Sequence, residues 1–194
     1  MRQLLPFLLR MLPAMAAALP AAVIFRLWGM RRLTRRGLTT TPWHEAGLLA
    51  FLLFAAGLAA VTVLPQGWRW TAPTWDRVNL LLFRVFRDSL WEYRAGNRGY
   101  FIINIFGNIV MFLPFGFFPP LLWRRADSLW RGTGTALGAS LCVELCQLFQ
   151  DRGTDVDDLW LNALGGALGY GLYRLFRRLR PGFAKKFRIS AKKG

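Results

Sequence analysis

The chain has 194 residues, the length of about one domain, and its 26 Lys and Arg residues against 10 Asp and Glu residues give a formal charge of +16. Hydrophobic residues make up 54% of it, which excludes a disordered basic tail because such segments are poor in apolar residues. Two cysteines are too few for a secreted disulfide scaffold, and the long apolar runs exclude a soluble nucleic-acid-binding domain. The composition therefore indicates a small integral membrane protein with basic loops.

Apolar stretches, taken in chain order, predict the membrane-spanning helices. A helix needs roughly 20 apolar residues to cross about 30 Å of hydrocarbon. The first and last runs are short, but arginines at their ends can extend to the lipid headgroups. We therefore expect an all-α, polytopic transmembrane helix bundle with spans at about 8–28, 46–65, 99–122, 130–150 and 158–175. The first run also fits a signal peptide, although its stronger positive cluster follows the run rather than precedes it.

The segment 66–98 is predicted to lie in the membrane interface. It contains tryptophans, which anchor chains at the interface: Trp68, Trp70, Trp75 and Trp91. Apolar residues recur in it at helical spacing: Val78, Leu81, Leu82, Val85, Phe86 and Leu90. This pattern predicts an interfacial amphipathic helix on the outer surface. The expected organisation is an N-terminal helix and basic loop over 1–45, a membrane domain over 46–176 and a basic cytoplasmic tail over 177–194.

Two glycine pairs have the spacing of closely packed membrane helices, in which small residues four positions apart let backbones approach. They are Gly134 with Gly138, and Gly165 with Gly169. We expect both pairs to lie at helix contacts.

The distribution of Lys and Arg predicts the orientation, since these residues concentrate in cytoplasmic loops. With the N-terminus outside, 17 of the 26 Lys and Arg residues fall on the inner side, and seven of the 10 acidic residues fall on the outer side. We therefore expect a multi-pass cell-membrane protein with a cytoplasmic C-terminus and the loop 151–158 outside. The basic tail favours contact with anionic lipids over nucleic acid, because no recognition motif accompanies its charge.

Glu144 lies inside the fourth predicted span, where an ionisable group is costly and by default marks a functional site. Ser140, Glu144 and Gln147 share one helix face because they are spaced at i, i+4 and i+7. Asn108 and Asn162 lie at a similar depth on other spans. Such polar groups also form simple interhelical hydrogen bonds, but the buried Glu favours an outward-facing site.

An acidic stretch follows Glu144 and bears on metal binding. Asp155, Asp157 and Asp158 offer the oxygen ligands that hard cations prefer. Their spacing does not match the calcium-loop signature. We therefore expect no metal site and no cofactor.

Two segments share a pattern with one known family. They are NIVMFLPFGF (108–117) and SLCVELCQLFQDRGTDVDDLWLNALGGALGY (140–170), with VTVLP (61–65) and DRVNLLLF (76–83) upstream. The pattern resembles that of the VanZ-like membrane proteins over roughly 48–172, although Leu81 and Leu82 stand where that family usually has a proline. The resemblance implies an integral membrane protein. The family's namesake is linked to low-level resistance to teicoplanin, a lipoglycopeptide that binds cell-wall precursor outside the cell.

The resemblance also implies a set of site residues, whose roles depend on which of two functions holds. The first function is the binding of an amphiphile, with Arg152 meeting an anionic headgroup. Its ligand-binding residues are Asn79, Asn108, Gln147, Arg152, Asp155 and Asn162. The alternative is an intramembrane enzyme that acts on a lipid-linked substrate, with Glu144 as general acid or base. Its second catalytic residue is Asp158, and Asp155 and Asp158 orient Arg152 or hold a divalent cation. The lack of a Ser–His or Cys–His arrangement near the outer face argues against covalent catalysis.

Overall fold

The computed structural model describes residues 4–64, 72–73, 76, 78–97, 99, 102–150 and 153–191. Within these ranges the long helices are α1 (Leu4–Arg35), α2 (Pro42–Thr62), α5 (Asn108–Leu122), α6 (Leu129–Leu148) and α7 (Val156–Leu179). Shorter helices are α3 (Arg84–Arg94), the π-helix η2 (Ile102–Gly107), the 3-10 helix η3 (Arg124–Ala126) and α8 (Pro181–Lys185). The strands have two residues each: β1 (Leu38–Thr39), β2 (Val78–Asn79), β3 (Thr154–Asp155) and β4 (Ser190–Ala191).

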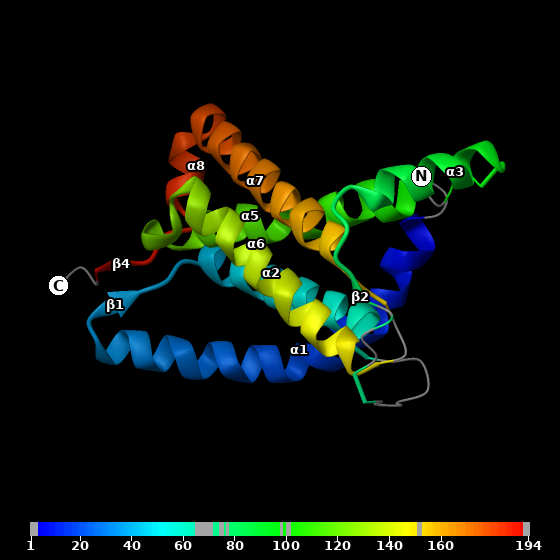
Figure 1. Cartoon of the computed structure of the whole chain (residues 1–194). Coiled ribbons are helices and arrows are strands. Elements are labelled where there is room, and N and C mark those ends of the chain that lie inside the picture. The colour runs from blue at the N-terminus through cyan, green and yellow to red at the C-terminus, as the bar shows by residue number, and fades with distance from the viewer. Residues whose placement is uncertain are drawn as a thin grey trace.

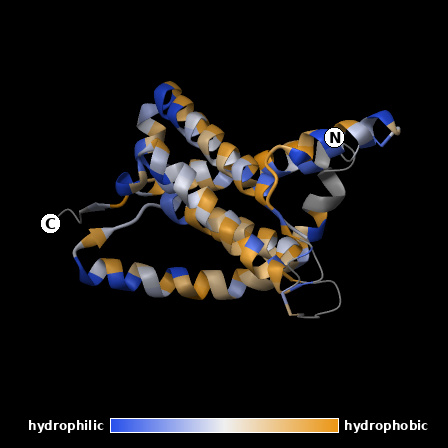
Figure 2. Cartoon of the chain, in the orientation of Figure 1, coloured by the Kyte–Doolittle hydropathy of each residue, from blue (hydrophilic) through white to orange (hydrophobic). Residues whose placement is uncertain are grey.

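The predicted all-α bundle of membrane helices is confirmed. Three helical segments of the described chain are long and apolar enough to cross a membrane: Leu9–Arg35, Pro42–Thr62 and Asn104–Leu122. Helices α6 and α7 occupy the last two predicted spans and have similar lengths, but their sequences are more polar. Figure 2 shows hydrophobic residues along the middle of α1 and α2, with hydrophilic residues at the end of α1 nearest β1.

Helices α5 and α7 pack with their backbones in close contact, because glycines line the interface. A Cβ atom on Gly165 would lie 2.3 Å from the carbonyl oxygen of Ile109, and one on Gly116 would lie 1.8 Å from that of Gly166. The predicted role of the Gly165 and Gly169 pair in helix packing is therefore confirmed. The prediction for Gly134 and Gly138 is wrong, since a Cβ at either position would meet nothing within 4 Å.

Two pairs of short strands mark the two ends of the bundle, as Figure 1 shows. Strand β2 pairs in parallel with β3, at the end where α6 finishes and α7 begins; we call this the β2–β3 end. Strand β1 pairs antiparallel with β4, at the end that holds α8 and the start of α2; we call this the β1–β4 end. An apolar core joins the helices between the ends; it includes Met11, Leu58, Met111, Phe112, Phe115 and Ala136.

The amphipathic helix of the interfacial segment exists but is shorter than its spacing predicts. Helix α3 begins at Arg84, whereas Val78 belongs to strand β2. The helix starts late because the Asn79 side chain accepts a hydrogen bond from the backbone N–H of Leu81 at 3.1 Å, a local bond that competes with helix formation. Phe83 then takes a left-handed conformation, with φ of 65°. Trp91 is exposed on α3, and the other three tryptophans of this segment lie outside the described residues.

Candidate functional site

Polar side chains gather at the β2–β3 end, where the sequence predicts a site. We call this group the polar cluster. Helix α6 contributes Ser140, Glu144 and Gln147, and β2 contributes Asn79. The remaining members come from β3 and the starts of α5 and α7: Asn108, Asp155, Asp157, Asp158 and Asn162. These residues, which come from separate helices and strands, therefore lie together near one end of the molecule.

Glu144 connects α6 to strand β3. Its side chain is 4% exposed, and its Oε2 accepts a hydrogen bond from the backbone N–H of Asp155 at 3.1 Å. The Asp155 carboxylate in turn accepts from Asn79 Nδ2 at 2.8 Å and from the backbone N–H of Asp157 at 2.9 Å, as the N-cap of α7. Three predicted site residues, Asn79, Glu144 and Asp155, thus form one connected network.

Asn108 and Asn162 contact different partners within the cluster. Asn108 Nδ2 donates to Asp158 Oδ1, which joins the start of α5 to the start of α7. Asn162 Nδ2 donates to Ser140 Oγ at 2.8 Å, and both residues are buried. Within the described chain, Asn162 Oδ1 is buried and has no hydrogen-bond partner. The predicted site residues of α5, α6 and α7 are therefore linked in pairs.

Gln147 and Gln150 tie the cluster to helix α2. Gln147 Nε2 donates to the carbonyl oxygen of Thr62 at 3.2 Å, and Gln150 Nε2 donates to that of Val63. These carbonyls lie at the C-terminus of α2, where helix carbonyls have no partner within the helix. Arg152, the remaining predicted ligand-binding residue, lies outside the described residues.

Asp157 is a member of the cluster that neither the motif nor the depth argument selected. It is fully buried, and its carboxylate accepts three hydrogen bonds of 2.7 Å, from the backbone N–H groups of Phe83 and Val85 and from Trp160 Nε1. An acidic residue in the first turn of a helix commonly accepts hydrogen bonds. No signal in the sequence indicates that the donors come from the start of α3.

The side chains of the described cluster are mainly carboxylates and amides, and they form hydrogen bonds. Ser140 Oγ is buried against Asn162, and the single histidine, His44, lies at the β1–β4 end, where its Nδ1 is 2.7 Å from the carbonyl oxygen of Phe187. Among the residues that the structure describes, no group of three or more His, Cys, Asp or Glu side chains is arranged to hold a metal ion.

An exposed apolar surface adjoins the polar cluster. Leu80, Leu81, Leu82 and Phe83 are each at least 59% exposed. The Phe83 and Phe86 rings lie 5.5 and 5.7 Å from the Trp160 ring, whose Nε1 bonds Asp157. Polar and apolar surfaces therefore meet at the β2–β3 end.

A known protein family matches most of the chain. The VanZ/LLP1 family model matches residues 51–177, a range that contains every member of the polar cluster. No curated protein and no solved structure matches the chain. Because the match covers well over half of the 194 residues, the chain belongs to the VanZ/LLP1 family of membrane proteins.

Proposed function

We propose that this protein binds an amphiphile at the outer face of the cytoplasmic membrane and acts there on the cell envelope, in glycopeptide resistance of the teicoplanin type. One observation carries the proposal: the polar cluster adjoins the exposed apolar segment 80–83. A polar headgroup bound at the cluster would have its acyl chain beside Leu80–Phe83. Teicoplanin and lipid-linked envelope precursors both combine a polar head with an apolar chain.

The ligand-binding residues of this proposal are the predicted ones. They are Asn79, Asn108, Gln147, Arg152, Asp155 and Asn162, together with the carboxylates of Glu144 and Asp158. Asn162 Oδ1 supports this assignment, because a buried acceptor without a partner in the described chain is costly. A hydroxyl or amide donor of a bound headgroup would satisfy it.

The distribution of charge supports the proposed orientation. The acidic residues of β3 and α7 lie at the β2–β3 end, whereas the arginines at the end of α1, on η3 and at the end of α7 lie at the β1–β4 end. Because Lys and Arg concentrate on the cytoplasmic side, we propose that the β1–β4 end and the C-terminus face the cytoplasm. The basic tail there is attracted to anionic lipids by about 1 kcal/mol per Lys or Arg.

The test is a pair of matched substitutions. Glu144→Gln removes a buried carboxylate of the cluster, and Glu92→Gln makes the same change on α3, outside the cluster. We expect Glu144→Gln to abolish the teicoplanin phenotype and the binding of labelled teicoplanin to the purified protein, with normal abundance in the membrane. Glu92→Gln should leave all three unchanged. An unchanged phenotype in Glu144→Gln, or a fall in abundance that matches the loss of phenotype, would contradict the proposal.

The same preparations separate binding from catalysis. In the enzyme alternative, with Glu144 as general acid or base, purified protein converts a lipid-linked precursor to a product that chromatography resolves. Ser140 is buried against Asn162, which argues against a serine nucleophile. We therefore expect the precursor to be recovered unchanged. Turnover that Glu144→Gln abolishes would replace the binding proposal with the enzymatic one.

A further inference from the structure

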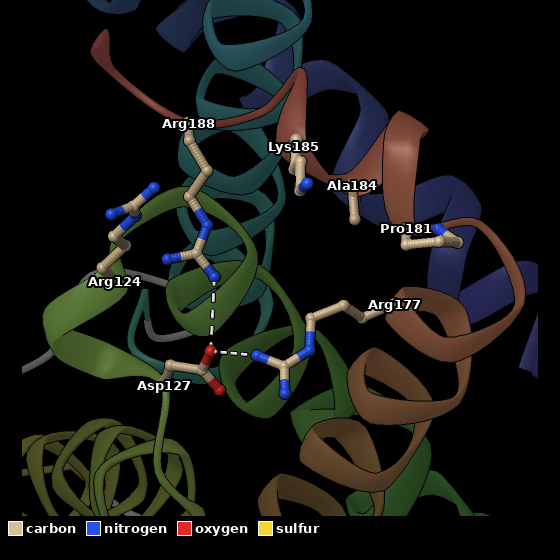
Figure 3. A pocket seen from close by; sticks show the side chains of 7 residues that line it. All are labelled: Arg124, Asp127, Arg177, Pro181, Ala184, Lys185 and Arg188. Carbon is tan, nitrogen blue, oxygen red and sulfur yellow. Dashed lines mark hydrogen bonds and ion pairs between the residues drawn. The ribbon is translucent and has the colours of Figure 1, made fainter. Parts of the chain in front are cut away.

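The β1–β4 end contains a cationic pocket that the outward-facing site does not use. Its volume is about 480 Å³, and four basic side chains line it: Arg124, Arg177, Lys185 and Arg188. Asp127 is the single acidic residue in the lining. As Figure 3 shows, the basic side chains come from separate elements, namely η3, α7, α8 and the segment that follows α8. The pocket therefore carries a clear excess of positive charge.

Asp127 organises one side of this pocket. Its carboxylate accepts hydrogen bonds from Arg177 and, at 2.8 Å, from the Tyr173 hydroxyl. Arg188 Nη2 donates to that hydroxyl at 2.8 Å and lies 3.4 Å from Asp127 Oδ2. Arg177 and Arg188 reach Asp127 from two directions (Figure 3). The Asp127 carboxylate therefore forms ion pairs with both arginines and positions them.

The other basic groups lack such a partner. Neither Arg124 nor Lys185 forms an ion pair in the ranges that the structure describes. In the same ranges the buried Nη1 of Arg188 has no hydrogen-bond partner, while the Arg188 side chain is only 15% exposed. Leaving a buried donor of a charged group without an acceptor is costly. An anion that enters the pocket would supply an acceptor, and it would supply the counter-charge that Arg124 and Lys185 lack within the described residues.

The surroundings of the pocket point to a lipid as the source of that anion. An aromatic cluster beside it brings the Phe183 ring within 4.7 Å of Trp43, 5.4 Å of Phe187 and 5.9 Å of Phe176. Tryptophan is enriched at the level of the lipid headgroups, and Trp43 is exposed. A phosphate bound in the pocket would therefore lie at the depth of the lipid headgroups.

We propose that this pocket, between η3, the end of α7 and α8, binds the phosphate group of an anionic phospholipid of the inner leaflet. Arginine forks and an ammonium group are the usual partners of phosphate oxygens. The proposal goes beyond the general attraction of a basic tail to a charged surface, because it assigns the phosphate to four named side chains. It relies on the proposed orientation only for the choice of leaflet and is independent of the polar cluster.

The experiment compares two double variants of the full chain that remove the same charge. Arg124→Gln with Lys185→Gln removes the two unpaired lining cations and leaves the Asp127 network in place. Arg174→Gln with Arg178→Gln removes two exposed arginines of α7 that do not line the pocket. Native mass spectrometry in neutral detergent counts bound phosphatidylglycerol, with phosphatidylcholine and inorganic phosphate as the other probes. A thermal melt without lipid shows that each variant is folded.

We expect phosphatidylglycerol to bind the parent chain in preference to phosphatidylcholine. The pocket variant should bind it about tenfold more weakly, as expected when charge-assisted hydrogen bonds to an anion are lost, while the control variant keeps its affinity. If the affinity for phosphatidylglycerol falls equally in both variants, general attraction between opposite charges explains the binding and the pocket does not. If inorganic phosphate binds and stabilises the chain as strongly as phosphatidylglycerol does, the ligand is a free anion. Either result overturns the proposal and leaves the Glu144→Gln test untouched.

Discussion

The backbone of Phe83 is held by the side chain of Asp157, although 74 residues separate the two in the sequence. Asp157 Oδ1 accepts the Phe83 N–H at 2.7 Å, and Oδ2 accepts the Val85 N–H at the same distance. Phe83 has a left-handed backbone with φ of 65°, which is uncommon for a bulky residue and persists only when the surroundings impose it. The carboxylate therefore fixes the point at which the exposed apolar segment turns into α3.

The first prediction is that Asp157→Asn releases the start of α3 from the bundle. In asparagine one of the two carboxylate oxygens becomes an NH2 group, which would face one of the two backbone N–H groups without accepting a hydrogen bond from it. A hydrogen bond to a charged group contributes about 1.5–3 kcal/mol, and we expect the free energy of unfolding to fall by an amount in this range. The measurement is thermal unfolding in detergent together with hydrogen exchange of residues 83–90. Asp88→Asn, on the surface of α3, is the control, and an equal effect there would contradict the role of Asp157.

The second prediction concerns the glycine contact between α5 and α7. In Gly116→Ala the new Cβ would lie 1.8 Å from the Gly166 carbonyl oxygen, so the two helices must move apart. We expect a large loss of thermal stability and of membrane abundance. Gly134→Ala is the matched control, because nothing lies within 4 Å of that Cβ, and it should be neutral or stabilising by up to about 1 kcal/mol through helix propensity. Equal stabilities of the two variants would refute the close packing of α5 on α7.

The third prediction tests the ion pair that joins α1 to α2. Arg26 donates to both oxygens of Glu45, at 2.9 and 3.0 Å, and the side chains are 12% and 20% exposed. A double-mutant cycle with Arg26→Gln and Glu45→Gln should give a coupling energy of about 1–3 kcal/mol, which is more than exposed pairs show. The readout is the unfolding free energy of the four proteins in one detergent. A coupling near zero would mean that the pair adds nothing to the α1–α2 contact.

The positions of the long helices were predictable because apolar runs separated by charges set them. The residues of the candidate site were largely predictable for the same reason, since Glu144 and Asn162 stand out in otherwise apolar helices. Their hydrogen-bond partners were not predictable, because spacing along one helix does not show which neighbouring element each side chain contacts. Asn162 contacts Ser140 rather than Glu144, and Asp157 binds a distant backbone. For Gly134 and Gly138 the spacing was right for close packing, but the sequence does not show which face of α6 is covered.

The antiparallel pairing of β1 with β4 has a consequence for how the protein is assembled. Thr39 lies opposite Ser190, and their side chains are in contact across 151 residues of sequence. Helices α1 and α2 can enter the membrane as a hairpin as soon as they are made, but the strand that follows α1 finds its partner only after α7 and α8 have been synthesised. Contacts between such distant parts of a chain form slowly, because they close a large loop. The β1–β4 pair can therefore form only after the last long helix has been synthesised, which makes it a late contact in folding.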